Sequence, residues 1–341
     1  MADDTTQIEG AIAEAPQWRR WLACLVLGSA GGAAMLFAFI LLIDPYTTGR
    51  LALSGRLDMA SGNASFAKAA VIRDPQFDTA IVGASTGDSL DPAHISGISN
   101  RSVAQLSIQG TNPANVRLIS RTFERHRRGK PTWQIIVIDL NWCHPRLATE
   151  IYPMPKWVYQ SSDLEYLSEI FNAEALRTAI RRIGIWIGTV PQSIRVDGYS
   201  FRLPLGFDPR IAARDIPTMP PLAVTNDWTP DAPFPEIEAL AAHIGGLDRS
   251  TTILLAVLPV FTSTFEPGSP AERREAMCRS RLQDIAAARP NTAVHDMRSN
   301  SDMAQDPPSY IDQIHFHDRL ARIVEKRIGE AVRDLGPTAH K

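Results

Sequence analysis

The sequence predicts an α/β protein with three layers, a parallel sheet covered by helices on both faces, preceded by one N-terminal transmembrane helix. Two observations predict this fold class. Short apolar segments alternate with amphipathic segments through residues 73–341, and residues 21–43 contain no charged side chain. Strands that alternate with helices at this spacing favour a parallel sheet with helices on both of its faces.

Composition and charge limit the classes of function. The chain has 341 residues, of which 44% are hydrophobic and 21% charged, a composition typical of globular proteins. Its 35 Lys and Arg residues nearly balance 37 Asp and Glu residues, which gives a formal net charge of −2. Such a chain lacks the positive field that neutralises a phosphate backbone, so we expect no nucleic acid partner.

The first expected element is a membrane anchor at residues 21–43. This uncharged run is long enough for a helix to cross a hydrocarbon core of about 30 Å. It is also longer than the apolar region of a cleaved signal peptide, so we expect the anchor to be retained. Arg19 and Arg20 precede the run and favour a cytoplasmic N-terminus of residues 1–20, with the main domain periplasmic or extracellular.

The elements after the anchor follow one another in a regular order. Residues 44–72 are small, polar and rich in Gly and Ser, and we interpret them as a stalk or linker, or as an irregular lead-in, before an exported domain of residues 73–341. Strands are expected at residues 78–82, 102–108, 133–139, 252–258 and 292–296, and helices at residues 113–128, 162–182, 234–244, 270–288 and 318–335.

Residues 184–235 interrupt this order. They contain nine prolines and little periodicity, and the stretch is too long for a simple connection in a compact domain. We therefore interpret it as an insertion. It could act as a lid or a partner-binding flap, or it could be a surface excursion with local packing.

Two cysteines, Cys143 and Cys278, lie outside the expected membrane helix. They could pair in an oxidising compartment or remain buried free thiols. The sequence has no C-x-x-C motif and no His/Cys cluster at metal-ligand spacing, so we expect no metal site.

The segment FDTAIVGASTGDSLDP at residues 77–92 contains two candidate nucleophiles. In α/β enzymes a nucleophile at the carboxyl end of a strand meets substrate at the rim of the sheet, facing the amides of the next helix. The first strand ends near Val82, so Ser85, two residues after Gly83, occupies that position. Ser89 belongs to a literal G-D-S-L but has no strand directly before it, so Ser85 is the candidate.

Asp312 and His315 supply the groups that a serine nucleophile needs. Their spacing, just before the last expected helix, lets one loop present both side chains. The imidazole would take the serine proton as general base, and the carboxylate would fix the imidazole tautomer. Each residue also has a structural interpretation, because Ser85 and Asp312 are good helix caps and His315 could be partly buried. Further acid–base candidates are Asp139, His144, His295 with Asp296, and His317.

The order Ser…Asp-x-x-His resembles the SGNH (GDSL-type) hydrolase superfamily, over about residues 77–335. This resemblance implies a flavodoxin-like three-layer fold and catalysis without a cofactor. It also implies an oxyanion hole made by the amides of Ser85 and Gly110 and by the side chain of Asn141. Asn141 lies in D-L-N-W, where the superfamily has G-x-N-D, so this position departs from the usual pattern.

Three segments, IVGASTGDSLDP, QLSIQG and YIDQIH, look like those of membrane-anchored members that act on envelope polymers. Those members move or remove acyl groups, commonly acetyl, on exported polysaccharide or a related polymer. The resemblance therefore implies a membrane-anchored serine esterase or O-acyltransferase, which could work with a membrane-embedded acyl-transfer partner.

An inactive scaffold is the alternative function. It would bind envelope polymer or a membrane acyltransferase partner through the insertion and nearby aromatic residues, namely Trp157, Tyr159, Trp186, Tyr199, Phe201, Phe207 and Trp228. One distance distinguishes the two hypotheses. An enzyme should hold Ser85 Oγ within about 2.6–3.2 Å of the His315 ring, and a scaffold has no reason to do so.

Overall fold

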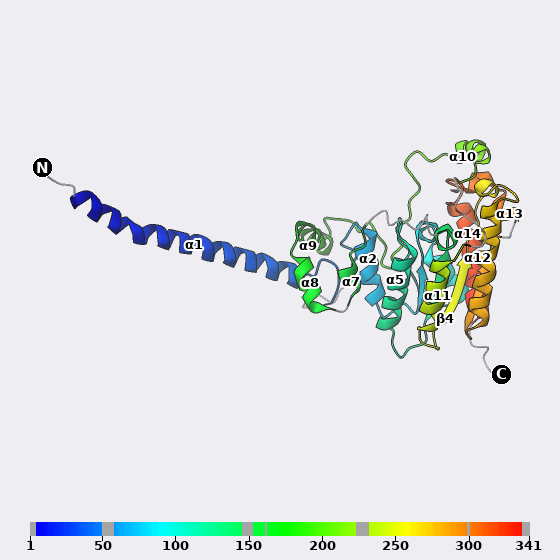
Figure 1. The fold of residues 1–341 in the computed structure, drawn as a ribbon, viewed down its shortest axis with the longest axis horizontal. Helices are drawn as coiled ribbons and strands as arrows, with labels where there is room; N and C mark the ends of the chain where they lie inside the picture. The colour runs from blue at the N-terminus through cyan, green and yellow to red at the C-terminus, as the bar shows by residue number, and fades with distance from the viewer. Residues whose placement is uncertain are drawn as a thin grey trace.

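The structure is a computed structural model that describes residues 5–49, 58–144, 153–160, 162–222, 232–298 and 301–335. Figure 1 shows a long N-terminal helix, α1 (Thr5–Ile43), that projects from an α/β body. In that view the first turns of α1 lie far from the body.

The body is built on a five-stranded sheet with the strand order β2-β1-β3-β4-β5. All neighbouring strands are parallel, which confirms the predicted parallel sheet. The strands are β1 (Thr79–Val82), β2 (Val103–Gln105), β3 (Trp133–Ile138), β4 (Thr252–Val257) and β5 (Thr292–Asp296). The three central strands are buried along their whole length, as expected for strands that are covered on both faces.

Helices cover both faces of this sheet. The helices are α2 (Ala64–Arg73), α3 (Ser85–Asp88), α4 (Pro92–Ser99), α5 (Pro113–His126), α6 (Leu140–Cys143), α7 (Lys156–Tyr159), α8 (Asp163–Ile170), α9 (Ala173–Trp186), α10 (Pro209–Asp215), α11 (Pro235–Gly245), α12 (Pro270–Ala287), α13 (Ser301–Ala304) and α14 (Asp318–Asp334). Short 3-10 turns are η2 (Ile216–Thr218), η3 (Thr262–Thr264) and η4 (Pro307–Ser309).

Alternate residues of the strands contribute to two different hydrophobic cores, because successive side chains of a strand point to opposite faces of the sheet. Ile81 and Val137 belong to a core shared with α4 and α14. Val82 and Ile138 belong to the other core, shared with α2, α5, α11 and α12. The expected helix at residues 162–182 is divided into α8 and α9, because the Asn172 side chain accepts the amide of Ala175 and starts a new helix there.

The long apolar helix expected near the N-terminus is present in α1. Residues Gln17–Ile43 are long and apolar enough to cross a membrane, and residues 17–36 are exposed along the whole run. The last turns differ, because Ile40 is buried against the body. The rings of Phe37 and Phe171 also meet edge to face, with 5.6 Å between their centroids.

The stalk predicted at residues 44–72 is wrong for the described residues 44–49 and 58–72. These residues pack into the body, and α2 buries Val71 and Ile72 completely. Small residues such as Ala67 and Ala70 let α2 lie close to its neighbours. The Gly/Ser/Ala composition that suggested a flexible linker therefore reflects close packing instead.

Arg182 fastens the end of α1 to the body. Its fully buried guanidinium donates to the carbonyl oxygens of Ile43, at 2.7 Å, and Asp44. The same group pairs with Asp58 at 3.0 Å, and the indole nitrogen of Trp186 donates to that carboxylate at 2.8 Å. These buried bonds join the end of α1 to α9 and to Asp58, and they hold the end of the apolar helix against the body.

The predicted insertion at residues 184–235 has little regular structure where it is described, and Trp228 lies outside the described residues. Its turn at residues 195–199 lies along the edge strand β2, where the Gln105 amide donates to the Asp197 carbonyl at 2.8 Å. Gly198 has a φ of +87°, and a Cβ there would clash with the Gln105 carbonyl, so glycine is required. The insertion thereby covers the edge of the sheet.

Candidate active site

Ser85 is the first residue of α3 and directly follows the turn after β1, at the carboxyl end of the sheet. The turn is packed tightly against neighbouring strands. A Cβ on Gly83 would lie 2.7 Å from Val137 Cβ, and a Cβ on Gly87 would lie 2.6 Å from Ser107 Oγ. Both glycines are therefore needed for close packing, so the glycine of the literal G-D-S-L has a structural role.

Ser85, His315 and Asp312 form a continuous chain of hydrogen bonds. The distance from Ser85 Oγ to His315 Nε2 is 2.8 Å, and the distance from His315 Nδ1 to Asp312 Oδ2 is 2.7 Å. Ser85 and His315 are separated by 230 positions in the sequence. The distance between Ser85 Oγ and His315 Nε2 lies within the range expected for a nucleophile and its general base.

Backbone amides hold Asp312 in place. Its Oδ1 atom accepts the amides of Ile314 and His315, each at 2.8 Å. Burial raises the pKa of Asp312, but the hydrogen bonds from the His315 ring and these amides outweigh burial and leave the pKa below its ordinary value. An ionised Asp312 accepts the Nδ1 proton of His315, which leaves Nε2 free to accept the Ser85 hydroxyl proton.

The loop that carries Asp312 and His315 is anchored at both ends. Tyr310 and Phe316 pair as an antiparallel bridge and are almost completely buried. Between them, the side chain of Gln313 donates to the carbonyls of Pro220 and Ser263, each at 3.0 Å. The loop of Asp312 and His315 is thus tied to the insertion and to the segment after β4.

A cavity of about 270 Å³ opens beside this hydrogen-bonded chain. Gly110 and Asn141 line it together with Ser85 and His315, so the structure brings together the proposed oxyanion donors and the serine. Asn141 Oδ1 is buried without a partner among the described residues. The apolar part of the wall consists of Ala84, Leu140, Leu222, Leu258, Pro259, Val260 and Ile314.

Ser89 does not line this cavity. Its hydroxyl is buried and donates to the carbonyl of Thr86 at 3.1 Å. The segment around it is held by Gln105, whose side-chain nitrogen donates to the carbonyls of Gly87 and Leu90, each at 2.8 Å. Ser89 is therefore a structural residue of this turn.

The histidines considered as rivals lie elsewhere. His144 is fully buried beside Glu275, at 3.1 Å, and burial lowers its pKa to about 3. Burial likewise lowers the pKa of His295, and Arg279 pairs with the neighbouring Asp296 at 2.7 Å. His317 hydrogen-bonds to the carbonyl of Pro308 at 2.6 Å. None of these four residues lines the cavity at Ser85.

Asp139 does line the cavity, together with Arg298, which the sequence analysis did not single out. Burial raises the pKa of Asp139 to about 7, against the opposing charges of Arg298 and His315. Arg298 pairs with Glu275 and donates to the Leu258 carbonyl at 3.0 Å. Its position two residues after β5 could have indicated that Arg298 lies near Ser85, because residues that follow parallel strands gather at one edge of the sheet.

Cys143 and Cys278 form a disulfide with 5.6 Å between their Cα atoms, which resolves the alternative that the sequence left open. The bond joins the end of α6, the helix that carries Asn141, to α12. Within the described ranges, no group of three or more His, Cys, Asp or Glu side chains is arranged to hold a metal ion.

In comparisons with known proteins, the chain matches no family model and no curated protein.

Proposed function

We propose that this protein is a membrane-anchored serine esterase or O-acyltransferase of the SGNH (GDSL-type) class. Its substrate would be an acylated cell-envelope polysaccharide or a related polymer, with acetyl as the simplest acyl group. The observation that carries this proposal is the hydrogen-bonded chain from Ser85 through His315 to Asp312, beside a cavity at the carboxyl end of a parallel sheet. This arrangement has the order of groups found in serine hydrolases.

In the proposed mechanism, Ser85 Oγ attacks the ester carbonyl while His315 Nε2 takes the hydroxyl proton. Asp312 keeps the imidazole oriented and stabilises the imidazolium that forms. The amides of Ser85 and Gly110 and the side chain of Asn141 would stabilise the oxyanion. His315 then returns the proton to the leaving alcohol, and water or a sugar hydroxyl takes the acyl group from Ser85.

The proposed location is a membrane facing an oxidising compartment, either the periplasm or the cell exterior. Residues 21–36 of α1 are uncharged, largely apolar and exposed, so a bilayer would cover surface that water otherwise contacts. Arg19 and Arg20 precede the apolar run, which favours a cytoplasmic N-terminus. The Cys143–Cys278 disulfide suits an oxidising compartment. A membrane-embedded partner could then deliver the acyl group if the reaction is a transfer.

The test uses the full chain in detergent micelles with p-nitrophenyl acetate and a fluorophosphonate serine probe. We expect wild type to react with both, and Ser85→Ala to lose labelling and at least about 10³-fold in turnover. Ser89→Ala removes a neighbouring buried hydroxyl and serves as the matched control, so it should keep both activities. A wild-type protein that neither labels nor turns over the ester would contradict the proposal.

A further inference from the structure

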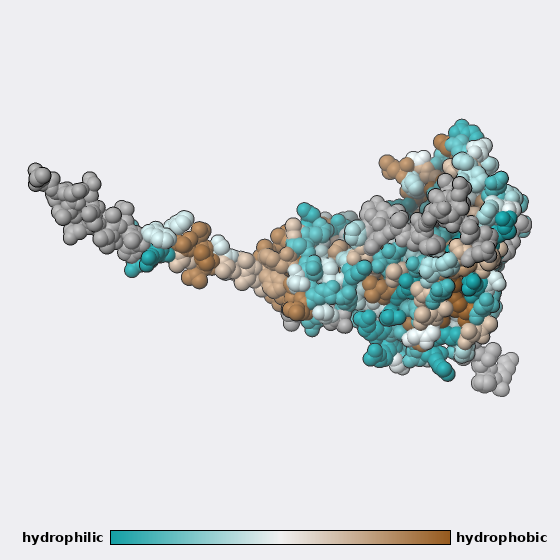
Figure 2. Space-filling model, in the orientation of Figure 1, coloured by the Kyte–Doolittle hydropathy of each residue, from teal (hydrophilic) through white to brown (hydrophobic). Residues whose placement is uncertain are grey.

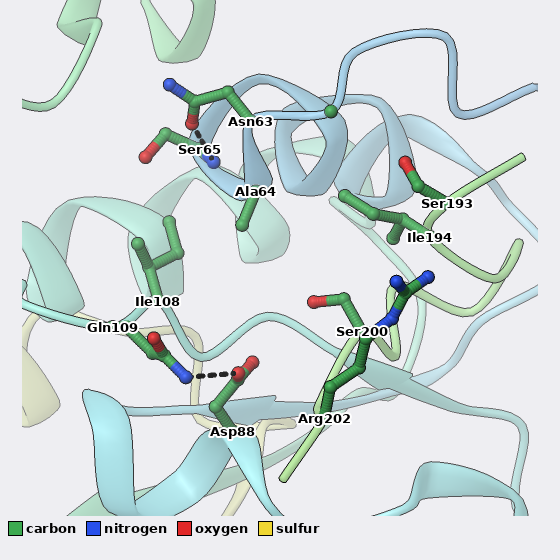
Figure 3. Close-up of a pocket in the computed structure, with 11 residues that line it drawn as sticks. Asn63, Ala64, Ser65, Asp88, Ile108, Gln109, Ser193, Ile194, Ser200 and Arg202 are labelled. Carbon is green, nitrogen blue, oxygen red and sulfur yellow. Dashed lines mark hydrogen bonds between the residues drawn. The ribbon is translucent and has the colours of Figure 1, made fainter. Parts of the chain in front are cut away.

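A polar cavity of about 570 Å³ lies next to the catalytic cavity. Figure 3 shows residues 193–202 of the insertion on one side of this space and Ile108 and Gln109 on the other. Gln109 directly precedes Gly110, which lines the cavity at Ser85. Adjacent residues of one backbone segment therefore line the polar cavity and the cavity at Ser85.

The polar cavity presents groups that suit a sugar. Amides and hydroxyls of Asn63, Ser65, Gln109, Ser193 and Ser200 line it, together with Arg202. Asp88 also contributes, but its charge is compensated because the buried ammonium of Lys68 lies 2.7 Å from it. These walls place many hydrogen-bonding groups beside a similar extent of apolar surface, a mixture that suits a polyhydroxylated group better than a hydrocarbon chain.

A third cavity, of about 730 Å³, runs along α9. Four apolar side chains, Ile180, Ile183, Ile187 and Val190, line it. Ile180 and Ile187 are 59% and 68% exposed, so they leave a large apolar surface open to water. This third cavity has the character of a site for a hydrocarbon chain.

The apolar and polar cavities share the residues Gly62 and Asn63. Arg181 lines the apolar cavity and reaches Ser193 of the polar cavity, with 3.5 Å between Nη2 and Oγ. Its Nε atom is buried without a partner among the described residues. The two cavities therefore form one track, with a guanidinium at the junction between its apolar and polar parts.

The apolar end of the track lies beside α1. Arg182, the next residue of α9, holds the carbonyl at the end of α1, and Phe171 contacts Phe37. Phe37 lies six residues before the end of α1, which corresponds to about 9 Å of helix. Figure 2 shows hydrophobic surface continuing from α1 onto the adjoining end of the body. With α1 in a bilayer, α8 and α9 would lie at its surface.

We propose that this track binds a membrane lipid that carries a sugar head group. The hydrocarbon chain lies along Ile180 and Ile187, the anionic linkage meets Arg181, and the sugar occupies the polar cavity with its acyl ester toward Ser85. The inference rests on the proposed function, including insertion of α1 into the membrane. It specifies the substrate as a glycan that is still attached to a lipid, rather than a free polymer.

Binding is tested without catalysis, on the full-length Ser85→Ala protein in phosphatidylcholine nanodiscs. The probe is a disaccharide joined through a phosphate to a hexadecyl chain that carries a diazirine, and cross-linked residues are mapped by mass spectrometry. We expect cross-links at residues 180–190, and the Ile180→Glu/Ile187→Glu variant should reduce them about tenfold, because charges replace apolar contacts. Ile323→Glu, on α14 and 46% exposed, is the matched control and should leave them unchanged.

Cross-links confined to α1, or equal labelling in the variant and the control, would overturn the lipid site. A kinetic experiment then tests whether the protein prefers a membrane-bound glycan over a free glycan. It compares the O-acetylated probe in nanodiscs, the same O-acetylated disaccharide in solution, and p-nitrophenyl acetate. We expect the double variant, with Ser85 intact, to lose about tenfold on the membrane-bound ester and less than about twofold on p-nitrophenyl acetate.

Equal effects of the double variant on the soluble and membrane-bound disaccharides would also overturn the inference, because the track would then recognise a free glycan. Failure of the wild-type protein on every ester would instead contradict the proposed esterase or acyltransferase. The cross-linking experiment uses the Ser85→Ala protein, which lacks the nucleophile. It therefore tests the lipid site whether or not the wild-type protein hydrolyses any ester.

Discussion

His315 Nδ1 lies 2.7 Å from Asp312 Oδ2, and the other oxygen of this carboxylate accepts two backbone amides of the same loop. A spacing of three residues is therefore enough for one loop to orient its own histidine. The ring is left with Nε2 directed at Ser85.

Asp312→Asn should lower kcat for p-nitrophenyl acetate by about 10²- to 10⁴-fold, because an amide no longer holds the imidazole in the required tautomer. KM should change little, since Asp312 does not line the cavity. Steady-state kinetics of the purified variant check this. Asp318→Asn, an exposed acid at the start of α14, is the control, and a similar loss in that variant would argue against a specific role for Asp312.

Asn141→Ala should lower kcat by about 10²- to 10³-fold, because one donor to the oxyanion is removed. The loss should appear in kcat rather than in KM, because the Asn141 side chain would donate to the oxyanion mainly in the transition state. Thr111→Val is a matched control in the same cavity, because its buried hydroxyl has no partner among the described residues. Comparable rates for Asn141→Ala and wild type would remove Asn141 from the oxyanion hole.

The sheet and the placement of Ser85 could be predicted because they depend on local patterns. The strand at residues 133–138 is apolar throughout and has to be covered on both faces. The position of Ser85 follows from the end of β1 and from the glycine two residues before it. Topology then brings the C-terminal loop to the same edge, because the carboxyl ends of parallel strands lie together.

Other features could not be predicted because they depend on contacts between distant residues. Arg182 and Asp58 are separated by 124 positions, and their pairing at the end of α1 has no local signature. Residues 44–72 therefore had the composition of a linker although the described ones are packed. Arg298 follows β5 and reaches the cavity at Ser85 across the end of β4, where its side chain also donates to the carbonyl of Ile138 at the end of β3, at 3.3 Å.

The Cys143–Cys278 disulfide should contribute strongly to stability because it closes a long loop between two buried positions. We expect the Cys143→Ser/Cys278→Ser variant to lose about 2–5 kcal/mol in the free energy of unfolding. Denaturant unfolding in detergent, with and without reductant, measures this loss. Cys24→Ser changes an exposed free cysteine of α1 and should leave the free energy unchanged; an equal effect of the two changes would contradict the assignment.

Asp139 should make stability depend on pH. Its pKa is about 7 in the folded protein, because burial disfavours the charged form, and about 4 when the chain is unfolded. As pH rises from about 4 to about 7, the unfolded chain gives up this proton while the folded chain keeps it. The contribution of Asp139 therefore becomes increasingly destabilising through this window and is constant above it.

Asp139→Asn removes this titration, so the variant should gain stability relative to wild type as pH rises from about 4 to about 7, by at most about 4 kcal/mol. The measurement is the free energy of unfolding of both proteins at several pH values, with Asp318→Asn as an exposed control that should show no such trend. A difference between Asp139→Asn and wild type that stays flat across the window would mean that Asp139 is already ionised in the fold. The free-energy cost of burying the charged Asp139 carboxylate would then have to be offset by Arg298, the cation that lines the same cavity.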